Sequence, residues 1–217
     1  MDTGVGNRPD DQRKALFRYS ASKLLSRLRE KGVTPRSVDL VVLTHLHFTS
    51  AGGAVRINAR GELSPTFPNA RYLVQRAAWQ DALEPSERVR FLYRTQDLLA
   101  LEEAGQVELL DGDSEVVPGV HLKVTHGHCR GHQILLLTAG ATRIAYLGAL
   151  MPTPFHLKPT WVSAFDSFPD ETARCKQEVL ALAEREGWVL IFPRWPGCPS
   201  AVPERRNGQL GLRPFPL

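Results

Sequence analysis

The stretch that constrains this chain most runs from Val41 to Gly53 and reads V-V-L-T-H-L-H-F-T-S-A-G-G. Its first residues are apolar without alternation, which is typical of a buried strand. Two histidines one residue apart follow, and then two glycines. Residues i and i+2 of an extended chain point to the same side. His45 and His47 can therefore offer two imidazoles to one point just beyond the carboxyl end of the strand.

An isolated H-x-H pair has a simpler explanation, two hydrogen-bonded histidines in a loop. Four further stretches of the chain have to be considered together with the pair. They are Asp2-Thr3-Gly4, the histidine-rich stretch 125–133 (T-H-G-H-C-R-G-H-Q), Tyr146-Leu147-Gly148-Ala149 and Phe192-Pro193-Arg194.

These five motifs, in this order, resemble those of the metallo-β-lactamase fold superfamily of metal-dependent hydrolases. The family patterns are D-T-G, T-H-x-H-x-D-H, T-P-G-H-T-P-G-H, Y-L-G-D and a final F-x-H, and the lactonase-like branch is the most similar in wording. The resemblance covers most of the chain and implies an α/β fold, the αββα sandwich. Family members have several strands before D-T-G, whereas Met1 directly precedes Asp2 here. Either the first strands are absent from the protein or its start has been assigned too late, and we expect a sandwich that lacks its N-terminal strands.

The resemblance implies that the first metal site of the family is kept. Its ligands correspond to His45, His47 and His128, all of which are present. Three neutral imidazoles with a fourth position open to water make a reasonable zinc site. Zinc in such a site lowers the pKa of its water toward neutrality. His126, Cys129, His132 and Cys198 stay open as replacement ligands, although His132 is expected to support the site and Cys129 to be a small buried residue.

The second metal site of the family has no counterpart in this sequence. Its four ligand positions, two Asp and two His in the family, hold Thr49, Ser50, Ala149 and Arg194. Two carboxylates are lost, and a permanent positive charge is added. We therefore expect at most one zinc ion. Arg194 either binds a small anionic ligand in the old active-site cleft or points to solvent, and the sequence leaves both open.

Two functions fit this degenerate active site. The first is a hydrolase-derived protein, catalytically impaired or non-catalytic, that keeps a three-histidine metal site. It binds a small anionic ligand, or a partner protein, through the old active-site cleft and Arg194. The alternative is a mononuclear zinc hydrolase acting on lactone, ester or thioester substrates. The sequence contains no G-x-S-x-G elbow and no phosphate-binding loop, so serine-nucleophile and nucleotide-hydrolase chemistry have no support.

Composition bounds the remaining classes. A chain of 217 residues with 42% hydrophobic and 23% charged residues can bury one core, and we expect a single domain over residues 1–217. The net charge of +4 is not gathered into a basic patch with aromatics, which argues against nucleic acid as a partner. Some members of the superfamily are nucleases, so that alternative is kept. No apolar run approaches a membrane span and no signal peptide is recognisable, so we expect a cytoplasmic protein without membrane contact.

Hydrophobic periodicity and turn residues predict the elements. We expect helices from Asp10 or Asp11 to before Gly32, over 77–83, over 87–104 and over 169–186. We expect strands over 71–74, 107–110, 116–117, 120–124, 133–138, 143–147 and 188–192. Residues 56–70 are expected to be a loop, and residues 200–217 a loosely ordered tail.

Overall fold

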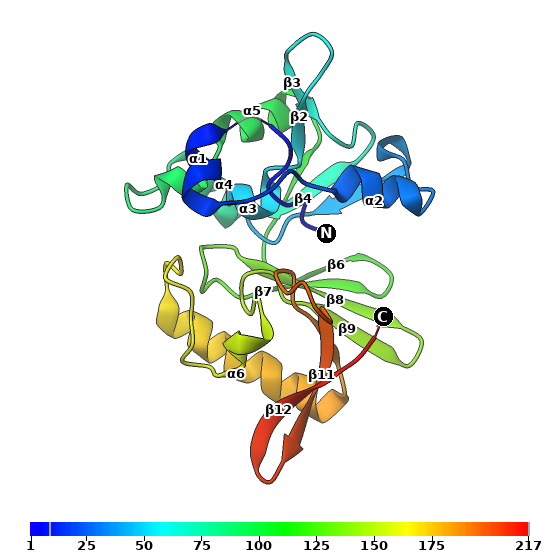
Figure 1. Ribbon diagram of the computed structural model, residues 1–217, viewed down its shortest axis with the longest axis vertical. Coiled ribbons are helices and arrows are strands. Elements are labelled where there is room, and N and C mark those ends of the chain that lie inside the picture. The colour runs from blue at the N-terminus through cyan, green and yellow to red at the C-terminus, as the bar shows by residue number, and fades with distance from the viewer. Residues whose placement is uncertain (9, 217) are drawn as a thin grey trace. The chain divides into compact units, whose positions relative to one another are not determined.

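The computed structural model describes residues 1–8 and 10–216 and divides into two compact units at Leu110. Each unit has its own hydrophobic core. Figure 1 shows the chain from its N-terminal unit, in blue to green, to its C-terminal unit, in green to red. The expected single domain over residues 1–217 therefore stays a prediction, and the two units are described separately.

The first unit is built on a short parallel sheet with the strand order β1-β4-β5. The strands are β1 (Leu40–Val42), β4 (Arg71–Gln75) and β5 (Val107–Leu110). The helices are α1 (Asp11–Phe17), α2 (Leu24–Glu30), α3 (Phe48–Ala51), α4 (Arg76–Leu83) and α5 (Thr95–Glu103), with 3-10 turns η1 (Pro35–Ser37) and η2 (Arg90–Leu92). Four of the five residues of β4 are buried, as expected for the central strand of a parallel sheet.

Two helix predictions in this unit are wrong in their extent. The expected helix from Asp10 or Asp11 to Gly32 is split, because Arg18 adopts a left-handed conformation (φ 49°) that ends α1. The expected helix over 87–104 is helical from Thr95 onward, after a 3-10 turn. Helical spacing of apolar residues continues through both breaks, so periodicity alone could not locate them.

The segment 56–70 was expected to be a loop, but it contains most of a small hairpin. Strands β2 (Val55–Ile57) and β3 (Leu63–Pro65) pair antiparallel. The Asn58 side chain holds the turn, because its oxygen accepts the backbone N–H groups of Arg60 (2.8 Å) and Glu62 (3.0 Å). Strands of three residues are too short to show an alternating pattern.

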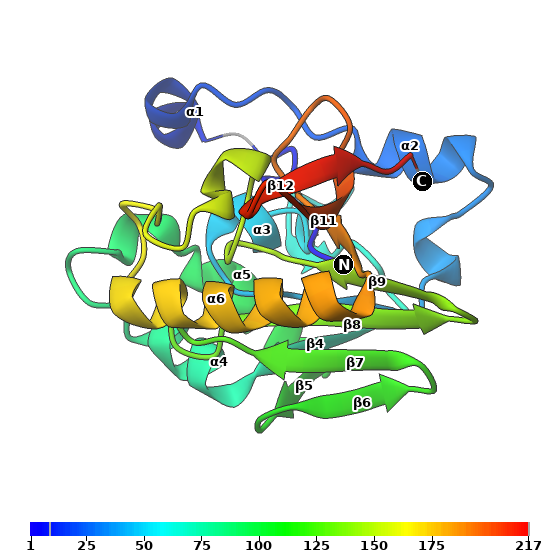
Figure 2. The same cartoon turned by 90° about the horizontal axis from the view of Figure 1, so that it is seen from below.

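The second unit contains a seven-stranded sheet with the order β12-β11-β10-β9-β8-β7-β6. Its strands are β6 (Ser114–Val117), β7 (Val120–Val124), β8 (Gln133–Ala139), β9 (Thr142–Tyr146), β10 (Val189–Ile191), β11 (Ser200–Arg206) and β12 (Gln209–Pro214). Its helices are the 3-10 turn η3 (Pro154–Leu157) and α6 (Pro169–Glu186). Figure 2 shows α6 running alongside the strands of this sheet, and its buried residues share one core with Ile134, Ala145 and Leu190.

The prediction of a loosely ordered tail is wrong for residues 200–214. These residues form the β11–β12 hairpin, which pairs six residues of each strand. Asn207 (φ 50°) and Gly208 (φ 79°) make its turn, and both have the positive φ that a type I′ turn requires. Asn-Gly is a strong hairpin signal. The prediction of a loose tail followed instead from the abundance of proline, glycine and arginine in this segment.

Within residues 1–8 and 10–216, no helix combines the length and the apolar character that crossing a bilayer would require. The three cysteines are not joined in disulfides, and Cys129 and Cys175 are buried.

Two aspartates of the first unit are held by three arginines. Asp10 accepts ion pairs from Arg13 (2.8 Å) and Arg94 (3.0 Å), and Asp97 pairs with Arg8. Asp97 is only 4% exposed, and its burial raises the pKa to about 6 even though Arg8 beside it lowers the pKa. The folded chain therefore binds a proton at Asp97 more tightly than the unfolded chain, so acidification should stabilise this unit through Asp97.

We expect the free energy of unfolding to rise by about 1 kcal/mol through Asp97 when the pH is lowered from about 7.5 to about 5.5. In Asp97→Asn this contribution should be absent, because an amide does not titrate. Urea unfolding at both pH values, with chelator present, measures the difference. The exposed Asp39→Asn should keep the wild-type dependence, and an identical pH dependence in Asp97→Asn and the wild type would contradict the assignment.

Candidate metal centre

The first unit places His45 and His47 together directly after β1. Both side chains are buried, and their ring centroids lie 4.8 Å apart with the rings nearly perpendicular. His47 is extended (φ −61°, ψ 142°) and precedes the first residue of α3. The short helix turns the chain away immediately after the pair, so the two rings stay at the end of the strand. The ring of Tyr93 packs edge-on against His47 at 4.8 Å.

A chain of hydrogen bonds orients His45. The Thr44 hydroxyl donates to Oδ2 of Asp2 (2.9 Å) and lies 2.9 Å from Nδ1 of His45. Because its hydrogen is directed to Asp2, the Thr44 oxygen accepts from Nδ1–H of His45. This assigns the proton of His45 to Nδ1 and makes Nε2 the nitrogen that would ligate a metal.

The segment that carries Asp2 is fixed by close backbone contacts. The N–H of Asp2 donates to the carbonyl of Val42 (2.9 Å), and the N–H of Thr3 donates to the carbonyl of Ser50 (2.7 Å). The N–H of Gly53 donates to the carbonyl of Gly4 (2.9 Å). A Cβ on Gly53 would lie only 2.3 Å from the carbonyl oxygen of Thr3. The backbones of the D-T-G and G-G motifs thus lie in direct contact, which explains the glycine at position 53.

The second unit holds His128 in the loop after β7, also buried. Its Nδ1 lies 2.6 Å from Oδ1 of Asp166, whose side chain is 1% exposed. The carboxylate accepts Nδ1–H, so Nε2 is again the nitrogen that would ligate a metal. Backbone bonds fix the pair, because the N–H groups of Ser167 and Phe168 donate to the carbonyls of His128 (3.0 Å) and Gly127 (2.9 Å).

His132 supports the loop and does not present a ligand atom. The N–H of Ala149 donates to Nε2 of His132 (3.0 Å), and Nδ1 lies 2.6 Å from the hydroxyl of Thr125. Burial, together with the neighbouring His128, holds the pKa of His132 well below its usual value. A neutral ring with Nε2 as acceptor uses the lone pair that a metal would need.

The other alternative ligands have different surroundings. His126 accepts the N–H of Gly131 at Nδ1 (3.2 Å) and is exposed. Cys129 is buried, as expected from the sequence. Cys198 is exposed, and its Sγ lies 3.2 Å from the carbonyl of Ser200.

The four positions that depart from the family pattern offer no anionic ligand. Ser50 and Ala149 are buried, Thr49 is half-buried and Arg194 is exposed. The backbone N–H of Arg194 donates to the carbonyl of Pro152 (2.9 Å). Hydroxyl, methyl and guanidinium groups are poor ligands for a divalent cation near neutral pH.

The three histidines predicted from the sequence thus suit zinc by their chemistry. His45, His47 and His128 are buried imidazoles, the preferred nitrogen ligands of zinc. Two of them have Nδ1 engaged by a polar partner, the arrangement typical of metal-bound histidines. Asp166 was missed by sequence reasoning, because no motif surrounds it and 38 residues separate it from His128.

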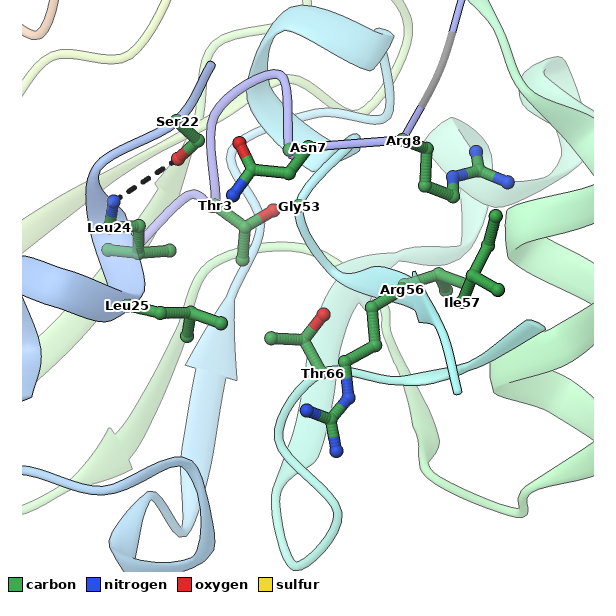
Figure 3. Close-up of a pocket in the computed structure, with 12 residues that line it drawn as sticks. Thr3, Asn7, Arg8, Ser22, Leu24, Leu25, Gly53, Arg56, Ile57 and Thr66 are labelled. Carbon is green, nitrogen blue, oxygen red and sulfur yellow. Dashed lines mark hydrogen bonds between the residues drawn. The ribbon is translucent and has the colours of Figure 1, made fainter. Parts of the chain in front are cut away.

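The first unit also contains a hollow of about 190 Å³ beside the D-T-G segment. Figure 3 shows Thr3, Ser22, Arg56 and Thr66 around it, with the side chain of Arg8 turned away from them. Neither His45 nor His47 is among the residues that line it. It is therefore separate from the histidine pair.

Comparison with known proteins gives a consistent relationship. A sequence model of the metallo-beta-lactamase superfamily matches residues 1–194. An N-acyl homoserine lactonase of Bacillus thuringiensis is 31% identical over 115 residues, which are 53% of this chain and 39% of that protein. A lactonase of the same name from Bacillus cereus matches equally well. The match thus spans well under half the length of these curated relatives.

Two solved structures are similar over the whole chain. A probable metal-dependent hydrolase from Staphylococcus aureus has a TM-score of 0.87 at 24% identity and is covered over 78% of its length. A dizinc quorum-quenching lactonase, solved with its product N-hexnoyl-L-homoserine, has a TM-score of 0.81 at 16% identity and is covered over 75%. At these identities the likeness establishes the fold, and the family and α/β fold class predicted from the sequence are confirmed.

Proposed function

The chain belongs to the metallo-β-lactamase superfamily, and from that premise we propose that it binds one zinc ion through His45, His47 and His128 with impaired or lost hydrolase activity. It has the fold of a family of metal-dependent hydrolases and is related to lactonases. The number of metals, the ligands and the loss of activity are the proposed part.

The observation that carries the proposal is the orientation of His45 and His128 by polar partners. The Asp2 carboxylate acts on His45 through Thr44, and Asp166 acts on His128 directly. Each partner fixes a tautomer with the lone pair on Nε2. Burying the Asp166 carboxylate costs free energy, which its bond to His128 offsets. Retention of this arrangement supports a site that still binds metal.

Impaired catalysis is supported by the positions that have lost ionisable ligands. In the family, the Asp at the position of Thr49 takes part in proton transfer and the Asp at the position of Ala149 bridges two metals. Neither a threonine hydroxyl nor a methyl group can accept a proton near neutral pH. We propose that Arg194 instead binds a small anionic ligand, since a guanidinium suits carboxylate and phosphate groups.

A mononuclear zinc hydrolase is the second candidate. The orientation of His45 and His128 favours it, and so do relatives named N-acyl homoserine lactonase. A bound zinc ion would supply Lewis acidity toward the carbonyl oxygen of a lactone, ester or thioester. The residues of this chain would then hold the ion and keep both histidines in the ligating tautomer.

Zinc binding by Asp166→Asn tests the proposal. We expect the wild type to bind one equivalent of zinc, and Asp166→Asn to bind it about 10–100-fold more weakly, because the amide does not hold Nδ1–H as the carboxylate does. Competition with a chromophoric chelator measures the affinity. The exposed Asp170→Asn is the matched control and should bind as the wild type does.

Two outcomes would contradict the proposal, equal zinc affinity in Asp166→Asn and the wild type, or two equivalents retained by the wild type. Zinc-dependent turnover of a lactone, abolished in His45→Ala, would favour the second candidate over the first. Turnover by the metal-free protein would contradict both.

A further inference from the structure

The second unit carries a groove that belongs to none of the motifs above. Three parts of the unit surround it: η3 together with the turn that follows, helix α6, and the β11–β12 hairpin. Its volume is about 660 Å³. Small-molecule sites have volumes of roughly 300–1,000 Å³. Its walls are largely apolar, formed by Leu157, Leu180, Ala181 and Leu210. None of the candidate metal ligands lines it.

Two of the aromatic side chains that line this groove are exposed to solvent. Phe155 is 63% exposed and Trp161 is 53% exposed. Phe155 is held by an edge-on contact with Trp195, with ring centroids 4.9 Å apart. Large apolar side chains gathered around a concave surface are typical of a binding site.

A buried lysine fixes the rim that carries Trp161. Lys176 of α6 is fully buried, and its Nζ donates to the carbonyls of Lys158 and Trp161, both at 2.7 Å. Burial lowers the pKa of Lys176 to about 8. A buried ammonium group costs free energy unless it is hydrogen-bonded, so its placement here serves to hold this turn in one shape.

The groove has one uncompensated positive charge. Lys158 lies 5.2 Å from the centre of the Trp161 ring, and no carboxylate pairs with it among the residues that the structure describes. The other cation of the lining, Arg205, is neutralised by two bonds to Glu184 (2.9 and 3.0 Å). The lining therefore combines apolar walls with a single free cation at its rim.

We propose that this groove binds a medium-chain aliphatic carboxylate, with the alkyl chain along α6 and β12 and the carboxylate at Lys158. The apolar walls suit an alkyl chain, and the single cation suits one anionic end group. Each methylene that the walls bury should tighten binding, by up to about fourfold. Affinity should therefore rise steeply from hexanoate to decanoate.

Titration of the full chain with decanoate, below its micelle concentration and with EDTA present, tests the proposal. Tryptophan fluorescence and calorimetry are the readouts. We expect saturable binding of one decanoate per chain, tighter than hexanoate. Lys158→Gln should weaken decanoate binding about tenfold and leave decanol binding unchanged, whereas the control Lys123→Gln should bind as the wild type does. Trp161→Ala should weaken binding of both ligands, and circular dichroism checks that each variant is folded.

Three outcomes would overturn the proposal. The first is the absence of saturable decanoate binding, and the second is an equal effect of Lys158→Gln and Lys123→Gln on decanoate binding. The third is that Lys158→Gln weakens the binding of decanol as much as it weakens the binding of decanoate. A concentration-dependent dimer that Trp161→Ala dissociates, without decanoate binding, would assign the groove to a second copy of the chain. EDTA excludes a carboxylate bound to metal, so these results are independent of zinc binding.

Discussion

Replacing together the four residues that differ from the family's second-site ligands is expected to raise the zinc content from at most one to two equivalents per chain. The variant carries Thr49→Asp, Ser50→His, Ala149→Asp and Arg194→His. It restores two carboxylates and removes the guanidinium that we propose opposes a second cation. Two unit charges roughly 4 Å apart repel by about 4 kcal/mol at an effective dielectric constant near ~20, and a divalent ion would feel about twice that as an upper figure. Elemental analysis after dialysis against a mild chelator is the measurement.

Single replacements should change the zinc content little, because residues that share one ion act as a unit. Thr49→Asp alone is therefore the matched control. Two tightly held metals in Thr49→Asp would refute the role given to Arg194. A second readout is stability, because Ala149 is buried next to His132. A carboxylate at position 149 should lower the melting temperature of the metal-free variant, and zinc should restore it.

Gly53→Ala is expected to lower the free energy of unfolding by about 3 kcal/mol and to weaken zinc binding at the same time. The new Cβ would lie 2.3 Å from the carbonyl oxygen and 3.2 Å from the Cβ of Thr3. Backbone cannot rotate away as a flexible side chain can, so the D-T-G segment must move. Asp2, which orients His45 through Thr44, would move with it.

Urea unfolding and chelator competition measure the two effects of Gly53→Ala. Gly61→Ala is the matched control in the same unit, because nothing lies within 4 Å of its added Cβ although its φ is +82°. We expect Gly61→Ala to cost about 1 kcal/mol through its backbone conformation alone and to bind zinc as the wild type does. If Gly53→Ala is destabilised but binds zinc with unchanged affinity, the D-T-G segment has no role in zinc binding.

Local signals in the sequence were sufficient for several elements. Helix α6 begins at Pro169 and ends at Glu186 as predicted, because proline starts a helix well and Gly187 ends it with φ 68°. The family, the α/β fold and the adjacency of His45 and His47 were also accessible, since each depends on motifs or on residues two apart. The pair Asn207-Gly208 is also a local signal, and it predicts the β11–β12 hairpin where composition predicts a loose tail.

The hydrogen bonds that orient the candidate ligands form only in the tertiary structure. Asp166 reaches His128 across 38 residues, and Asp2 reaches Thr44 across 42. Lys176 occupies the apolar stripe of α6, where a lysine is unexpected, and only the carbonyls of the 158–161 turn account for it. Periodicity and turn chemistry report on neighbours within about one helical turn. A bond between distant residues depends on how the intervening elements pack, so the sequence determined which histidines were available and the fold decided how they are oriented.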